Sequence, residues 1–230
     1  PGRKSDSERF AGALRTYCIE AMMQDKKALQ AGTSHNLSTH FAEAFETKFL
    51  DKDNALKHVH QTSWGVSTRL IGGMIMTHSD DKGLVLPPSL ATTHVSIVPI
   101  LSNAGAKAQV LEVSERIAED IRREAARAGF LYEIGVHVDT DETKQPGWKF
   151  HEIELLGVPI RIEVGPRDLE KNQAVMTRRD DGKKEFIPLG ELPLRCVEGL
   201  KSLQKDLLER ARKFRDENTH QVETYADFKK

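Results

Sequence analysis

Apolar and polar positions along the first ninety residues change from strand-like to helix-like spacing. Two apolar-rich runs at 14–23 and 28–34 flank a polar turn at 24–27, which predicts a β-hairpin. Further along, the spacing of Phe41, Ala44 and Phe45 predicts a helix over 37–49, and a strand is predicted over 55–61. A second helix is predicted over 66–77, capped by Thr62 or Ser63 and packed through Leu70, Ile71, Met74 and Ile75. A buried strand is predicted over 84–86, ended by Pro87 and Pro88.

A second pattern, of strands alternating with helices, begins near residue 94. Strands are predicted over 94–101, 132–138 and 159–164, and a short helix over 149–156. Two amphipathic helices are predicted from the apolar stripes Val110, Val113, Ile117, Ile121 and Ala125, and Leu194, Val197, Leu200, Leu203, Leu207 and Ala211. This alternation predicts a βαβ unit of roughly one hundred residues. The fold class is therefore α/β in two parts, an α+β module with an antiparallel sheet followed by an α/β module, with the boundary at 87–93.

Composition and charge exclude several classes of protein and of binding site. Hydrophobic residues make up 38% of the 230, which is enough for a buried core. The 34 basic and 35 acidic residues nearly cancel, so any nucleic-acid contact must be a local patch. The sequence has two cysteines, Cys18 and Cys196, which lie far apart in the chain. This number and spacing exclude a disulfide framework or a cysteine-based zinc site within this chain. No apolar run is long enough for a membrane span, and residues 1–9 are too polar for a signal peptide.

We therefore expect a soluble protein of a reducing compartment. Because the sequence begins without Met, we also expect it to be part of a longer chain. Ordinary structure explains most of the remaining candidate chemistry. His58 and His60 have no carboxylate or cysteine at ligand spacing, so we interpret them as half-exposed strand residues. The run Asp80 to Gly83 fits a surface turn better than a divalent-ion site.

The first stretch with unexplained chemistry is 28–35, where a strand ends in consecutive hydrogen-bonding groups. Alternation places Thr33 and His35 on one face, and Gln30 on the other unless Gly32 introduces a bulge. A neutral imidazole and an amide can each donate and accept, as recognition of a carboxylate, an amine or a nucleobase edge requires.

The second stretch, 62–69, places Arg69 in the first turn of a largely apolar helix. Cations are disfavoured at helix N-termini. Arg69 is therefore either a surface residue or a residue held there for an anionic ligand.

The third stretch, 146–168, combines an aromatic residue with charged groups. Phe150 and Glu154 are one helical turn apart, and strand alternation predicts that Arg161 faces outward and is exposed. Such a surface can stack on a base and bond its edge. The alternative is that Arg161 pairs with Glu163 or Glu154 on a solvated face.

These three stretches, in this order, resemble prolyl-tRNA synthetases, which are class II aminoacyl-tRNA synthetases, of the type shared by archaea, eukaryotes and some bacteria. The resemblance covers essentially the whole chain, and residues 62–88 match the family's third class II signature. It implies that residues 1–91 are the C-terminal part of a catalytic domain. Residues 92–192 would be an α/β anticodon-binding domain with a mixed sheet, and 193–230 a helix leading to a C-terminal domain that is not in this sequence.

The resemblance also implies substrates, partners and site residues. The family joins proline and ATP, as its Mg²⁺ complex, into prolyl-adenylate and passes the prolyl group to tRNA(Pro). The full-length enzyme is expected to be a cytoplasmic homodimer with no membrane partner, and this chain to hold no metal site. Matching positions imply ATP contacts at Gln30, Thr33, Ser67 and Arg69, with Arg69 the catalytic group, proline contacts at His35, Trp64 and Gly65, and anticodon contacts at Phe150, Glu154, Arg161, Arg167, Asp168 and Lys184.

The sequence departs from the family in what it lacks. The first two class II signatures, which supply the dimer interface and another ATP-clamping arginine, are absent, as is the segment that grips the proline amine. We therefore expect a C-terminal half that is inactive alone. The alternative is a stand-alone RNA-binding accessory protein that reuses the anticodon-binding fold without catalysis; a third possibility is a purely structural partner.

Overall fold

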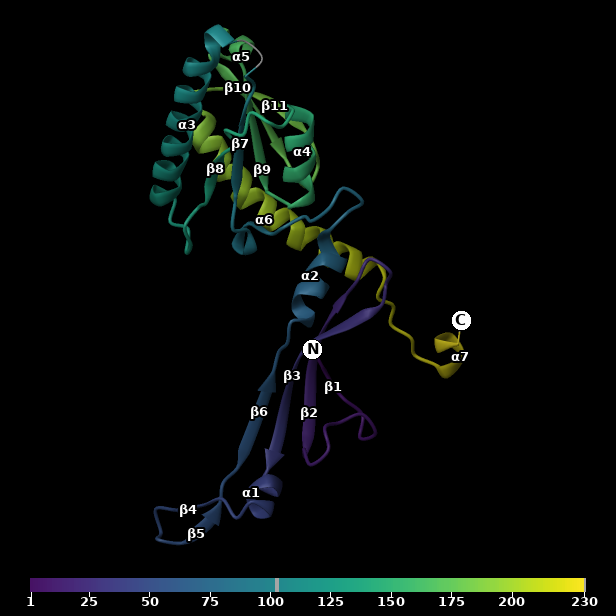
Figure 1. The fold of residues 1–230 in the computed structure, drawn as a ribbon. Coiled ribbons are helices and arrows are strands. Elements are labelled where there is room, and N and C mark those ends of the chain that lie inside the picture. The colour runs from purple at the N-terminus through teal and green to yellow at the C-terminus, as the bar shows by residue number, and fades with distance from the viewer. Residues whose placement is uncertain (102–103, 230) are drawn as a thin grey trace. The chain divides into compact units, whose positions relative to one another are not determined.

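The computed structural model describes residues 1–101 and 104–229. The chain forms two compact units, one of residues 1–77 and one from His78 onward, each shown as a ribbon in Figure 1. Within the described residues, no helix is long and apolar enough to cross a membrane.

The first unit is built on a four-stranded antiparallel sheet in the order β1-β2-β3-β6. Its strands are β1 (Gly2–Arg3), β2 (Arg15–Met22), β3 (Ala28–Ser38) and β6 (Gln61–Gly65). A separate two-stranded hairpin consists of β4 (Lys48–Leu50) and β5 (Leu56–His58), and the helices are α1 (His40–Ala44) and α2 (Arg69–His78). The predicted β2–β3 hairpin and antiparallel sheet are confirmed.

The predicted helix over 37–49 is wrong in length. Only five residues, His40–Ala44, are helical. Ser38 and Glu46, on either side, have φ angles of 50° and 52°. Because a left-handed residue cannot continue an α-helix, these two positions limit α1 to little more than one turn. The predicted strand over 55–61 is likewise divided, since β5 ends at His58 and β6 begins at Gln61.

The helix predicted from residue 66 begins three residues later, at Arg69. Thr62 and Ser63, the predicted caps, lie in β6, and Ser67 Oγ accepts from the Arg69 backbone N–H at 3.3 Å. The predicted packing of this helix is also wrong. No residue of α2 is buried, and Leu70, Ile71 and Ile75 are 42%, 59% and 38% exposed.

The second unit is a five-stranded mixed sheet in the order β11-β10-β9-β7-β8. Its strands are β7 (Val95–Pro99), β8 (Val136–Val138), β9 (Ile160–Val164), β10 (Gln173–Arg178) and β11 (Lys184–Pro188). Its helices are α3 (Lys107–Arg127), α4 (Pro146–Leu155), α5 (Pro166–Glu170), α6 (Leu192–Glu217) and α7 (Tyr225–Phe228). The pairs β7–β8 and β7–β9 are parallel, whereas β9–β10 and β10–β11 are antiparallel. The α/β class with a mixed sheet is confirmed.

Both faces of this sheet are covered by helices (Figure 1). On one face, Ile97 and Ile162 pack with Ile121 of α3 and Leu200 of α6, and all four are fully buried. On the other face, Val98 packs with Ile153 of α4 and with Val158. The apolar stripes predicted for the two long helices thus form the core.

Two local predictions for this unit need correction, and two strands were missed. Residues 84–86 form no strand, although Val85 is buried with Leu203 and Leu207. The strand predicted over 132–138 is only Val136–Val138. Strands β10 and β11 were missed. Strand β10 is buried on both faces and so shows no polar–apolar alternation, and in β11 only Ile187 is buried.

Candidate functional sites

Two of the ATP-contact candidates, Gln30 and Thr33, share one face of the first unit's sheet with His35, whereas Ser67 and Arg69 lie after its last strand. The register of β2 and β3 shifts so that Ile19 pairs with Gly32 but Glu20 pairs with Gln30. Ala31 is therefore the extra residue of a bulge, which brings Gln30 to the face of Thr33 and His35. This is the arrangement that the sequence allowed only if the strand bulged near Gly32.

The His35 ring is held in place by two neighbours. Its Nδ1 lies 3.0 Å from Thr16 Oγ1, and Thr16 is 1% exposed. The Phe10 ring lies 4.8 Å from the imidazole, and the Phe10 backbone N–H donates to Thr16 Oγ1 at 3.1 Å. Phe10 and Thr16 were missed in the sequence, since neither position is distinguished by a pattern.

Trp64 does not lie with His35. Across the β3–β6 pair, His35 opposes Ser63 and Ser34 opposes Trp64, so Trp64 points to the opposite face of the sheet. It is 80% exposed and lines a shallow apolar pocket with Tyr17, Ile19, Val66 and others. The proline contacts that the resemblance implies at His35, Trp64 and Gly65 are therefore not all on one face, because only Gly65, which pairs with Thr33, shares the face of His35.

In the second unit, four predicted anticodon contacts come together. The Arg161 guanidinium lies 4.3 Å from the Phe150 ring centroid and donates through Nη1 to Glu154 Oε1 at 3.2 Å. Lys184 Nζ lies 5.8 Å from the same ring. We call Phe150, Glu154, Arg161 and Lys184 the arginine cluster. Their side chains come from α4, β9 and β11.

The prediction that strand alternation exposes Arg161 is wrong. The residue is 6% exposed, because β9 is the central strand and α4 covers its outer face. Glu163, predicted from the sequence only as an alternative ion-pair partner of Arg161, joins two members of the arginine cluster. It accepts a hydrogen bond from Arg161 Nη2 at 3.1 Å and pairs with Lys184 Nζ at 3.1 Å. The i, i+2 spacing of Arg161 and Glu163 on one strand was the available signal.

The other two predicted anticodon contacts lie at the start of α5. Arg167 is exposed, whereas Asp168 accepts from the Gly165 backbone N–H at 3.0 Å. Asp168 therefore caps α5 at its N-terminus, where its negative charge also interacts favourably with the positive end of the helix dipole. Its structural role is clear without a ligand.

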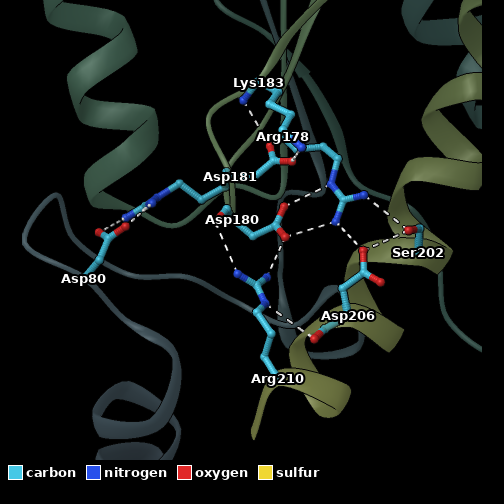
Figure 2. A network of polar contacts seen from close by, with 9 residues as sticks. Asp80, Arg178, Asp180, Asp181, Lys183, Ser202, Asp206 and Arg210 are labelled. Atoms are coloured by element: carbon cyan, nitrogen blue, oxygen red, sulfur yellow. Dashed lines mark hydrogen bonds and ion pairs between the residues drawn. The ribbon is translucent and has the colours of Figure 1, made fainter. Parts of the chain in front are cut away.

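A separate polar network joins the end of β10 to α6. Arg178 donates to Asp180 at 2.9 Å and to Asp206 at 2.7 Å, and Arg210 also donates to Asp180 (Figure 2). Burial alone would lower the pKa of Arg178, but its hydrogen bonds to Asp180 and Asp206 raise that pKa above its ordinary value. The same hydrogen bond from Arg178 lowers the pKa of Asp206. The network fixes the β10–β11 turn on α6.

Asp80 lies in the predicted surface turn and has a buried partner. The turn closes through a backbone bridge between Asp80 and Gly83. The Asp80 carboxylate accepts hydrogen bonds from both terminal nitrogens of Arg179, from Nη1 at 2.8 Å and from Nη2 at 2.5 Å. The Arg179 side chain is 4% exposed. The hydrogen bond from Arg179 lowers the pKa of Asp80 to about 2.

Asp80→Asn is expected to lower the free energy of unfolding of the second unit by about 1–2 kcal/mol at neutral pH, a reduced value because the half-exposed carboxylate is screened by water. Since the folded pKa lies below the ordinary 3.8, the stabilisation is complete above about pH 4 and is lost as the pH falls through about 2. Urea unfolding of both proteins across this range tests the expectation. Asp81→Asn, which removes the same charge from the same turn, is the control; equal losses in both variants at neutral pH would refute the role of the pair.

Comparison with known proteins identifies the class of the second unit. A family model described as Anticodon binding domain matches residues 94–198, which run from β7 into α6. The unit therefore contains an anticodon-binding domain of this family. Among residues 1–101 and 104–229, no group of three or more His, Cys, Asp or Glu side chains is arranged to hold a metal ion.

The relatives extend this to the whole chain. Over 99% of its length it is 55% identical to a protein named proline--tRNA ligase from Chlorobium luteolum, and 52% identical to one from Pelodictyon phaeoclathratiforme. A proline--tRNA ligase from Lachnospira eligens is 50% identical, again over 99% of this chain. The chain belongs to the proline--tRNA ligase family. It spans 46% of the length of the first two relatives.

Proposed function

We propose that this chain is the part of a proline--tRNA ligase that carries the third class II signature and the anticodon-binding domain. The observation that carries the proposal is the 55% identity over 99% of the chain. The whole enzyme activates proline with ATP, as its Mg²⁺ complex, and transfers it to tRNA(Pro), acting as a homodimer in the cytoplasm. Residues 1–91 belong to the catalytic domain, 92–192 to the anticodon-binding domain and 193–230 to a helix that follows it.

In this proposal the first unit contributes one face of the adenylation site. Gln30 and Thr33 contact the nucleotide, and His35, held by Thr16, contacts proline on the same sheet face. Gly65, opposite Thr33, leaves that face free of a side chain. Trp64, which points to the other face, contributes to proline binding only by shaping the strand.

Arg69 is the catalytic group, with Ser67 beside it. Its position in the first turn of α2 is unfavourable to a cation, and a triphosphate there compensates for this. Arg69 offsets charge on the pyrophosphate leaving group while the site positions the proline carboxylate. No general base is needed for this step.

The second unit reads the anticodon through the arginine cluster, and Arg167 and Asp168 are further anticodon contacts. Proline anticodons carry two adjacent guanines. A guanidinium offers paired donors to the acceptor edge of guanine, and a carboxylate accepts from its N1 and N2 hydrogens. Arg161 and Glu154 lie side by side and are bonded to each other, so a guanine binds here by replacing the hydrogen bonds that Arg161 donates to Glu154 and Glu163.

Charging assays test the proposal. The native protein that contains these 230 residues should join proline, and not other amino acids, to tRNA(Pro) in the presence of ATP and Mg²⁺. Binding of tRNA(Pro) without any charging would overturn it in favour of an RNA-binding accessory protein.

A further inference from the structure

One aromatic side chain on the sheet of the second unit is exposed and unassigned. Phe186 of β11 is 66% exposed. It pairs with Val175, which pairs with Glu163, and its strand neighbour Lys184 pairs with Thr177. Because side chains of paired residues point to the same side, Phe186 lies on the face that carries the arginine cluster, two strands or roughly 10 Å from Glu163.

Phe186 offers a ring surface that Phe150 does not. The Phe150 ring already has the Arg161 guanidinium at 4.3 Å from its centroid. Within the part of the chain that the structure describes, no ring or cation stacks on Phe186. An aromatic ring left free on a sheet face beside cations is typical of platforms on which single-stranded RNA bases stack.

Polar groups on the same face also lack partners. Among the described residues, Arg161 Nε and Thr177 Oγ1 are buried without a hydrogen-bond partner, and the two residues face each other across β9 and β10. Both line a pocket of about 150 Å³ together with Glu154. Unpaired buried polar groups are costly, so their retention here favours a polar ligand on this face.

We propose that Phe186 is a stacking platform for a base of the anticodon loop, next to the base that the arginine cluster reads. The inference rests on the proposed function and adds a contact residue to it. Lys183 and Lys184, three and two positions before Phe186, pair with Asp181 and Glu163 but keep their side chains exposed, so their ammonium groups can also bind the RNA backbone. A protein partner fits less well, because a stable interface buries about 800 Å² per partner and the neighbours of Phe186 on this face are charged or buried.

Fluorescence anisotropy with a labelled anticodon stem-loop of tRNA(Pro) tests the proposal on the 230-residue chain. Phe186→Ala should weaken binding roughly 5- to 100-fold, the loss expected for one stacked base. Phe186→Tyr should bind like the wild type, and Phe186→Leu, which keeps apolar area without a ring, should bind like the alanine variant. Leu131→Ala, at a fully exposed apolar residue in the segment before β8 at the opposite sheet edge, should have no effect.

The outcomes separate this proposal from the proposed function. If the wild type binds the stem-loop and Phe186→Ala binds equally well, the platform is refuted and anticodon recognition stands. If Leu131→Ala or Phe186→Tyr loses as much affinity as Phe186→Ala, the effect is not stacking and the platform is also refuted. No binding by the wild type would overturn both. Because Phe186 is exposed, thermal unfolding of its variants should match the wild type.

Discussion

Arg161→Ala is expected to produce the largest loss of stability and of RNA binding in the second unit. The substitution removes the guanidinium that donates hydrogen bonds to Glu154 at 3.2 Å and to Glu163 at 3.1 Å. Removing one partner of a buried ion pair costs about 3–5 kcal/mol of unfolding free energy. Loss of a bidentate base contact should weaken binding of the anticodon stem-loop roughly ten- to a hundred-fold.

Urea unfolding and anisotropy measure the two effects separately. Arg161→Lys keeps the charge but lacks the planar fork, so it should recover part of the stability and little of the binding. The matched control is Arg195→Ala, which breaks a half-exposed pair with Glu185 and should cost about 0–1 kcal/mol. If Arg161→Ala resembles Arg195→Ala in stability and leaves RNA affinity unchanged, the buried Arg161 neither stabilises the second unit through its ion pairs nor contacts the RNA.

The chain by itself is expected to show no measurable proline-dependent exchange of pyrophosphate into ATP. Transition-state stabilisation requires preorganised groups in a site that excludes water, and loss of one such group costs about 10²–10³ in rate. Here Ser67 and Arg69 are exposed, and no residue of α2 is buried. The resemblance to the family also implies a second ATP-clamping arginine and a segment that grips the proline amine, and residues 1–230 match neither.

Exchange of labelled pyrophosphate is the measurement. The proline--tRNA ligase from Chlorobium luteolum, assayed in parallel, is the positive control. Robust exchange by residues 1–230 would show that they assemble a working adenylation site, contrary to this expectation.

Elements were predicted correctly from the sequence where one face of a helix packs against the core and gives a clear apolar stripe. The stripe through Val110, Ile117 and Ile121 lies in the core, as its helical period indicated. In α1 the same reasoning failed, because the positive φ angles of Ser38 and Glu46 end the helix. Neither residue is a glycine, so composition gave no signal of these breaks.

Burial of site residues was harder to predict, because it depends on elements distant in sequence. Alternation correctly placed Arg161 and Glu163 on one face of β9, but it could not show that α4 covers that face. In the first unit, a single extra residue at Ala31 decides which face Gln30 occupies. The pairing of Ser34 with Trp64 likewise separates Trp64 from His35.

Discrimination of guanine from adenine tests the central claim most directly. The 230-residue chain is titrated with anticodon stem-loops of tRNA(Pro) carrying guanine, or adenine at either of the two shared positions. The account predicts that adenine weakens wild-type binding roughly ten- to a hundred-fold and that folded Arg161→Lys loses most of this preference. Equal affinity of the wild type for the guanine and adenine RNAs would contradict anticodon reading by this face.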